Sequence, residues 1–270
     1  MDGFDAEAAA ATLAETLRPL GTSERAVQEK RYLKSDLEFF GVAVPELRRA
    51  VKAAVRNHLA ASARSGDTPD GSTPGGSTPG GPARRRGARL DRETAVAWAL
   101  ALWREPVHER RAAAVEILQL AVPQLTADDL AAIEKLIRDS RTWAYVDSLA
   151  GNIAGTVALH DPSSWARIDE WAVDEDFWVR RSALLALLPG VRADLPDIER
   201  FVRYADPMVA EKEFFIRKAI GWVLREISRK DPQWVTSWTE THISEISGVT
   251  VREAVRHLPP HEQERLRLLR

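Results

Sequence analysis

The chain has 270 residues, of which 44% are hydrophobic and 29% are charged, as in folded globular proteins. The absence of cysteine excludes disulfides, thiolate nucleophiles and cysteine metal sites. A net charge of −2 argues against a protein that coats nucleic acid by bulk charge, although 38 Lys and Arg residues gathered on one face would still form a basic surface. The N-terminus is acidic and no apolar run approaches the length of a membrane span, so we expect a soluble cytoplasmic protein without membrane contact.

The first part of the chain, residues 1–61, is predicted to form three helices. Residues 5–19 are rich in alanine and end near Pro19, Thr22 or Ser23 would cap a second helix, and Pro45 suits the first turn of a third over about 45–61. Residues 62–89 differ sharply in composition, being rich in Gly, Pro, Ser and Thr and ending in three consecutive arginines. Because such a tract has little to bury, we predict a disordered loop insertion there.

From residue 90 to the C-terminus the sequence predicts helices arranged as repeats. Similar segments place an arginine at positions 110, 180, 217 and 252, so the gaps are 70, 37 and 35 residues, and a further copy is expected near 145. A period of about 35 residues filled by helix pairs is typical of an α-solenoid with a concave surface. We therefore predict an all-α helical-repeat solenoid that forms a single overall domain, with residues 1–61 as its N-terminal helices. In this register Trp143, Trp178 and Phe215 would be equivalent.

Trp143 and Asp147 form the first candidate constellation. They are four residues apart and would share one face of a helix. One interpretation is structural, with the indole packed in the core and the carboxylate directed into solvent. The other is functional, with both side chains on a surface that later repeats extend.

The helix predicted around 210–230 supplies the second constellation. Its apolar residues make one stripe, and four other side chains spaced by four, three and four residues make a separate face: Lys218, Trp222, Arg225 and Arg229. A tryptophan among cations suits a surface that faces nucleic acid. The alternative is that the tryptophan is half-buried and the cations are merely solvated. The neighbouring repeats offer cations at a similar register, namely Arg110, Arg111 and Arg181.

Four segments together resemble a known family. They are Arg-Tyr-Leu-Lys-Ser at 31–35 with the following Phe-Phe-Gly-Val-Ala-Val-Pro-Glu-Leu-Arg-Arg at 39–49, Trp-Ala-Tyr-Val-Asp-Ser at 143–148, Phe-Trp-Val-Arg-Arg-Ser-Ala-Leu-Leu at 177–185, and Glu-Phe-Phe-Ile-Arg-Lys-Ala-Ile-Gly-Trp-Val-Leu-Arg-Glu at 213–226. These segments are similar to DNA alkylation repair glycosylases of the AlkD type, which are HEAT-like repeat proteins. The resemblance covers most of the chain outside 62–89. This sequence departs from the family in two respects. It has Thr142 where family members carry an aromatic residue, and it contains the Gly/Pro tract, which family members lack.

The resemblance implies a monofunctional DNA glycosylase that excises cationic purines alkylated at N3 or N7, such as 3-methyladenine and 7-methylguanine. It assigns Asp147 to the deoxyribose, Trp143 and Trp222 to the lesion's sugar and backbone, and Arg181 to the cleft. The predicted partner is double-stranded DNA containing alkylated purines, bound by a monomer without cofactor or metal. The predicted DNA contacts are Tyr32, Arg110, Arg141, Lys218 and Arg225.

The residue types suit this chemistry. An alkylated purine leaves as a neutral base, so the charge that develops is on the sugar, where an ionised Asp147 would stabilise the oxocarbenium ion. Arg181 is expected to keep Asp147 ionised and to bind a phosphate. Two alternatives remain: a non-catalytic HEAT-like protein that binds branched or distorted DNA, and a protein scaffold with an apolar concave face.

Overall fold

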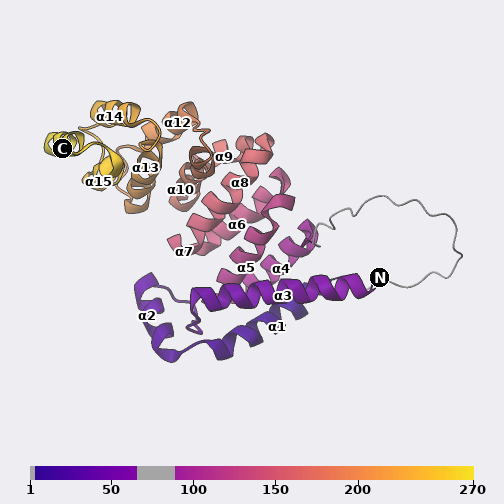
Figure 1. Ribbon diagram of the computed structural model, residues 1–270. Coiled ribbons are helices and arrows are strands. Elements are labelled where there is room, and N and C mark those ends of the chain that lie inside the picture. The colour runs from indigo at the N-terminus through magenta and orange to yellow at the C-terminus, as the bar shows by residue number, and fades with distance from the viewer. Residues whose placement is uncertain (1–3, 66–88) are drawn as a thin grey trace, which may run out of the picture. The chain divides into compact units, whose positions relative to one another are not determined.

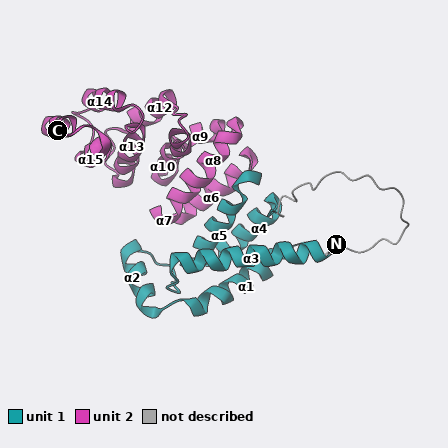
Figure 2. Cartoon of the chain, in the orientation of Figure 1, with its two compact units in different colours: residues 1–124 teal, residues 125–270 magenta. Residues whose placement is uncertain are grey.

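The computed structural model describes residues 4–65 and 89–270 of the chain. These ranges are helical and contain no β-strand, only one isolated bridge between Glu38 and Val107, which confirms the predicted all-α class. None of the helices in the described ranges combines the length and apolarity that crossing a bilayer requires. The chain divides into two compact units, residues 1–124 and 125–270 (Figure 2). The single overall domain stays a prediction.

The first unit packs α1, α3, α4 and α5 around apolar side chains. Its elements are α1 (Ala6–Leu17), η1 (Arg18–Leu20), α2 (Ser23–Leu33), α3 (Val44–Ser65), α4 (Arg92–Arg104), α5 (His108–Ala121) and η2 (Val122–Gln124) (Figure 1). Of the two predicted caps of the second helix, Thr22 is the one that accepts from a backbone N–H group of α2, and Asp5, predicted to be the first residue of the first helix, caps α1. Helix α3 continues four residues beyond the predicted end, because its last turn keeps helical residues such as Ala61 and Ala63. The predicted insertion therefore begins later than residue 62, and its remainder, 66–88, lies outside the described residues.

A buried carboxylate holds the loop between α2 and α3. Glu109 is fully buried and accepts hydrogen bonds from the backbone N–H groups of Phe40 at 2.9 Å, Gly41 at 2.6 Å and Val42 at 3.1 Å. Gly41 has a φ of 79°, in the left-handed region that favours glycine. Three N–H donors offset the desolvation of the charge, so this glutamate fixes the loop that follows α2.

The second unit consists of consecutive helix pairs. Helix α6 (Leu130–Ser140) precedes α7 (Trp143–Asp147), the π-helical turn η4 (Ser148–Ala154) and α8 (Gly155–His160), and α9 (Trp165–Trp171) precedes α10 (Phe177–Leu185) and α11 (Leu188–Arg192). Helix α12 (Ile198–Met208) precedes α13 (Phe214–Ile227), and α14 (Pro232–Thr241) precedes α15 (Gly248–Ala254), followed by α16 (Pro260–Leu269). The short 3₁₀ turns are η3 (Ala127–Asp129), η5 (Pro162–Ser164) and η6 (Val255–His257). In Figure 1, α9, α12 and α14 follow one edge of this unit, and α10, α13 and α15 follow the other.

The second helices recur with the predicted period. They begin at residues 108, 143, 177, 214 and 248, so successive copies start 35, 34, 37 and 34 residues apart. The copy predicted near residue 145 is α7. Helix caps set the register within each copy: the side chains of Thr142, Asp176 and Glu213 each accept from the backbone N–H two residues later.

These caps correct one detail of the predicted alignment. They make Trp143 equivalent to Phe177 and Phe214, the first residues of their helices, rather than to Trp178 and Phe215. The prediction was displaced by one residue because it aligned aromatic side chains, whereas the caps determine where each helix begins. Trp178 occupies the buried second position, and its ring lies 4.6 Å from that of Phe215.

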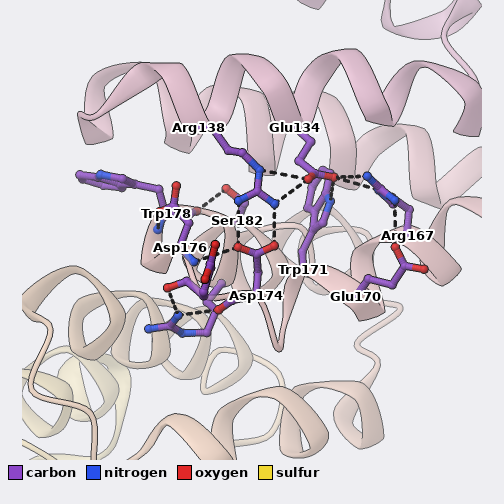
Figure 3. Close-up of polar contacts among 11 residues, drawn as sticks. Glu134, Arg138, Arg167, Glu170, Trp171, Asp174, Asp176, Trp178 and Ser182 are labelled. Atoms are coloured by element: carbon purple, nitrogen blue, oxygen red, sulfur yellow. Dashed lines mark hydrogen bonds and ion pairs between the residues drawn. The ribbon is translucent and has the colours of Figure 1, made fainter.

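A charged network ties the pairs together (Figure 3). Glu134 on α6 accepts hydrogen bonds from Arg138 at 2.7 Å, from Arg167 at 2.8 Å and from the Trp171 indole at 2.8 Å. Arg138 also donates two hydrogen bonds to Asp174, at 2.9 and 2.5 Å, and thus reaches the turn that precedes α10. The network connects α6 with α9 and with the start of α10.

Candidate functional site

Three of the predicted site residues occupy the same position in consecutive repeats. Asp147, Arg181 and Lys218 are each the fifth residue of their helix, in α7, α10 and α13 respectively. Helix α7 packs against α10, and α10 packs against α13. Equivalent positions on adjacent parallel repeats bring their side chains to one surface, so the shared position explains why these three charges meet.

Asp147 and Arg181 form a bidentate pair. Arg181 donates from Nε to Asp147 Oδ1 at 2.9 Å and from Nη2 to Oδ2 at 3.0 Å. Its Nη1 donates to the carbonyl oxygen of Phe215 at 2.6 Å. The Arg181 side chain is only 2% exposed, whereas that of Asp147 is 22% exposed. The guanidinium is therefore a buried support, and the carboxylate keeps a surface that faces solvent.

Burial dominates the electrostatics of this carboxyl group. Burial raises the pKa of Asp147 above its ordinary value of 3.8, against the opposing charges of Arg181 and Lys218. The sequence predicted that Arg181 would keep Asp147 ionised, and its charge does act in that direction. The expectation was incomplete because the desolvation of the carboxylate is the larger effect.

Trp143 begins the same helix one turn before Asp147. Its side chain is 36% exposed, so the structural interpretation, in which it packs in the core and the carboxylate alone faces solvent, is wrong. The preceding Arg141 ends α6 with a left-handed φ of 49° and is exposed. Thr142, between them, caps α7 through Ala144 N–H. The turn from 141 to 143 thus presents an arginine and an indole on the surface.

The predicted cationic face of α13 is partly neutralised. Lys218 Nζ lies 3.7 Å from Glu253, Arg225 is also paired with Glu253, and Arg229 lies 3.5 Å from Glu226. The cations are therefore ion-paired rather than merely solvated.

Trp222 lies between these cations along α13. It is half-buried, and its indole Nε1 is buried without a hydrogen-bond partner among the described residues. The Arg225 guanidinium carbon lies 5.8 Å from the centre of the Trp222 ring, which places a cation at the aromatic face.

Two predicted contacts belong to the first unit. Tyr32 lies near the end of α2 and is 72% exposed. Arg110 on α5 donates to the carbonyl oxygens of Leu102 at 3.4 Å and Ala101 at 3.3 Å. Arg110 therefore contributes to satisfying carbonyl groups at the end of α4, a role that its charge pattern did not predict.

The fifth helical position also identifies a residue that the sequence analysis left out of the site. In α15 this position is Arg252, which is exposed and forms no ion pair with any described residue. The next residue, Glu253, is the acidic partner of Lys218 and Arg225. The repeated motif aligns Arg252 with Arg217, whereas the first residues of α13 and α15 align it with Lys218, one residue later. Within 4–65 and 89–270, no three His, Cys, Asp or Glu side chains gather as metal ligands would.

Comparison with known proteins places these features in a family. The sequence matches the family model for DNA alkylation repair enzymes over residues 13–65 and 82–258. A predicted DNA alkylation repair enzyme from Enterococcus faecalis has the same fold, with a TM-score of 0.71 and 20% identity over 89% of this chain and 97% of that chain.

Two further solved structures are more distant. Both smu.31 from Streptococcus mutans UA159 and AlkD2 from Streptococcus mutans give a TM-score of 0.49 at 16% identity, over 79% of this chain and 100% and 98% of theirs. No curated protein sequence gives a significant match. The family match spans most of the described residues in both units and agrees with the resemblance found in the sequence, so this chain belongs to the DNA alkylation repair enzyme family.

Proposed function

We propose that this protein is a monofunctional DNA glycosylase that hydrolyses the N-glycosidic bond of purines alkylated at N3 or N7. The substrates would include 3-methyladenine and 7-methylguanine in double-stranded DNA. The observation that carries the proposal is Asp147, a partly exposed carboxylate that a buried Arg181 holds in a fixed orientation, with Lys218 close enough to affect its charge. Membership of a DNA alkylation repair family supports DNA as the substrate.

The proposed chemistry requires little of the protein apart from this carboxylate. Alkylation makes the base cationic, so it can depart as a neutral molecule without a general acid. Cleavage of the C1′–N bond leaves positive charge on the deoxyribose, and a fixed carboxylate next to that charge stabilises the transition state. Water then adds to C1′ and loses a proton. Each Asp147 oxygen has two lone pairs, so the hydrogen bonds from Arg181 leave acceptor capacity for the sugar or for this water.

The surrounding residues would bind the substrate. Trp143 is exposed one turn before Asp147, and aromatic faces favour cationic groups such as the developing oxocarbenium ion. Trp222 is half-buried with Arg225 at its ring face, and its exposed ring surface would pack against the sugar and backbone of the lesion. The further proposed DNA contacts are Tyr32, Arg110, Arg141, Lys218 and Arg225.

Measuring the release of bases from methylated duplex DNA tests the proposal. The wild-type protein should release 3-methyladenine and 7-methylguanine and leave the DNA strand uncut. Asp147→Asn should slow release about 100-fold or more, because it removes the negative charge while keeping the side-chain shape. Glu264→Gln makes the same amide replacement at an exposed position on α16 and should leave the rate unchanged.

Two results would contradict the proposal. The first is full activity in Asp147→Asn, which would remove the carboxylate from the mechanism. The second is the absence of base release together with tight binding to branched DNA, which would favour a non-catalytic DNA-binding role.

A further inference from the structure

Glu253 connects the two α13 cations that are proposed to contact DNA. Its carboxylate lies 3.7 Å from Lys218 Nζ through Oε1 and pairs with Arg225 through Oε2. The side chain is 18% exposed, whereas that of Lys218 is 45% exposed. One acidic side chain thus engages both cations, of which Lys218 remains accessible from solvent and Arg225 is 18% exposed.

Close helix packing fixes the position of Glu253. A Cβ atom placed on Gly221 of α13 would lie 2.7 Å from the Cβ of Glu253 and 2.8 Å from the carbonyl oxygen of Thr250. Thr250 also donates its hydroxyl to the carbonyl oxygen of Arg217 at 3.1 Å. Because α13 and α15 touch through a glycine, Glu253 stands directly beside the helix that carries Lys218 and Arg225.

The pairs extend into an alternating row of charges. Arg181 contacts Asp147, Lys218 acts electrostatically on Asp147 and contacts Glu253, and Glu253 contacts Arg225. The row contains three cations and two anions. In such a row, the effective charge that Lys218 offers to a phosphate or to Asp147 depends on whether Glu253 remains ionised and in place.

We propose that Glu253 is a positioning residue that competes with DNA phosphates for Lys218 and Arg225, and so restrains affinity for DNA and sets the charge beside Asp147. This inference rests on the proposed function for its DNA ligand. A phosphate that binds these cations competes with a carboxylate that already neutralises part of their charge. Binding of a phosphate therefore releases less free energy than binding to unpaired cations would.

Glu253→Gln tests this competition on unmodified duplex DNA, which requires no catalysis. The variant should bind about fivefold more tightly at low salt, because Lys218 loses its carboxylate partner and Arg225 keeps only Glu226, whose oxygen lies 3.8 Å from its Nε. The slope of log affinity against log salt should steepen by up to about 0.9 for each cation released. Glu253→Asp retains the charge and should behave like the wild type.

The pH dependence of base release is a second readout, because it reports the pKa of Asp147. Without the Glu253 charge, Lys218 acts on Asp147 unopposed and should lower the pKa of its carboxyl group. The acid limb of base release in Glu253→Gln should therefore move to lower pH, an effect that a purely structural role would not produce. If no variant releases bases but the affinity changes occur, the proposed function fails while the competition stands.

Lys218→Ala and Arg252→Ala provide a comparison that does not depend on how Glu253→Gln folds. Both cations are the fifth residue of their helix, but only Lys218 is paired with Glu253. Lys218→Ala should therefore weaken DNA binding less than Arg252→Ala. Equal losses for these two variants, or unchanged or weaker binding by Glu253→Gln, would overturn the proposal.

Discussion

Asp147 and Arg181 form a pair in which one partner is buried and the other reaches the surface. Burying a guanidinium carries a large desolvation penalty, which is offset here by two bonds to a carboxylate and a third to the Phe215 carbonyl oxygen. A buried ion pair of this kind is often no more stabilising than apolar residues in place of both partners. The arginine is therefore best explained by what it does for Asp147, which is to orient the carboxylate and to oppose its neutralisation.

The raised pKa of Asp147 predicts how base release depends on pH. Because the ionised carboxylate stabilises the sugar cation, release should decline as the pH falls through this pKa, which lies above 3.8. Single-turnover release measured from about pH 4 to pH 8, with protein-free DNA subtracted to correct for acid depurination, would show the limb. The residual base release by Asp147→Asn should not decline in this way. The same decline at low pH in both proteins would assign the titration to another group.

At the scale of elements, the helix that follows Asp147 approaches its neighbours closely at one glycine. A Cβ on Gly155, the first residue of α8, would lie 2.4 Å from the carbonyl oxygen of Ala186, whereas one on Gly151 in η4 would lie 3.5 Å from that of Leu185. The first distance is a clash and the second is an ordinary contact. The π-helical turn therefore ends where α8 meets the backbone that follows α10.

Two alanine substitutions one helical turn apart test this packing. Gly155→Ala should lower the free energy of unfolding by about 1–3 kcal/mol, because the backbone of the neighbouring turn has to move. Gly151→Ala should be neutral or stabilise by up to about 1 kcal/mol, since alanine favours helix and the site has room. Urea unfolding of both variants gives the comparison, and equal effects would contradict the predicted difference.

The fifth helical position gives a further prediction for α15. Arg252 is exposed at this position and is not engaged by an acidic side chain in the described part of the chain. Arg252→Ala should weaken binding to unmodified duplex DNA and reduce the salt slope by about 0.9, the effect of losing one phosphate contact. Binding titrations at several salt concentrations would measure both.

Lys135→Ala serves as the control for that variant. Lys135 is an exposed cation on α6, which is the first helix of its pair. Lys135→Ala therefore removes the same charge as Arg252→Ala, but from a different face. Similar losses from both variants would indicate that only net charge matters, and would contradict a DNA contact at Arg252.

At the scale of the whole molecule, acids and bases nearly cancel, so stability depends on where charges are paired. Burial opposes ionisation of Glu134, but its bonds from Arg138, Trp171 and Arg167 outweigh this and lower its pKa. A lowered pKa in the folded state means that the stabilisation is present above the unfolded pKa of about 4.3 and is lost as the pH falls below it. The raised pKa of Asp147 acts in the opposite sense.

Acid titration of stability tests this assignment. Glu134→Gln should lower the free energy of unfolding by about 2 kcal/mol at neutral pH, because three donors lose a charged acceptor. The loss should shrink as the pH falls below about 4.3, because the carboxylate of the unfolded wild type takes up a proton there while that of the folded protein is still ionised. Urea unfolding at a series of pH values would show this convergence, and a constant difference would contradict it.

Local pattern was enough to predict much of this protein. Helix periodicity and helix-breaking residues predicted the all-α class, and the period of about 35 residues predicted the repeat copy that corresponds to α7. The motifs identified the family that the family model confirms. The spacing of Trp143 and Asp147 placed them one turn apart. These inferences succeeded because each depends on residues close in sequence, where helical geometry alone fixes the relation.

Tertiary structure decided which charges meet. Asp147 and Arg181 are 34 residues apart, and Lys218 and Glu253 are 35 apart, so their contacts depend on where caps begin each helix and on how closely the helices pack. A shift of one residue turns a side chain by about 100° around its helix. The sequence by itself therefore determined the helices, their repeat and the candidate residues, whereas packing alone decided that Arg181 is buried under Asp147 and that Glu253 holds the cations beside it.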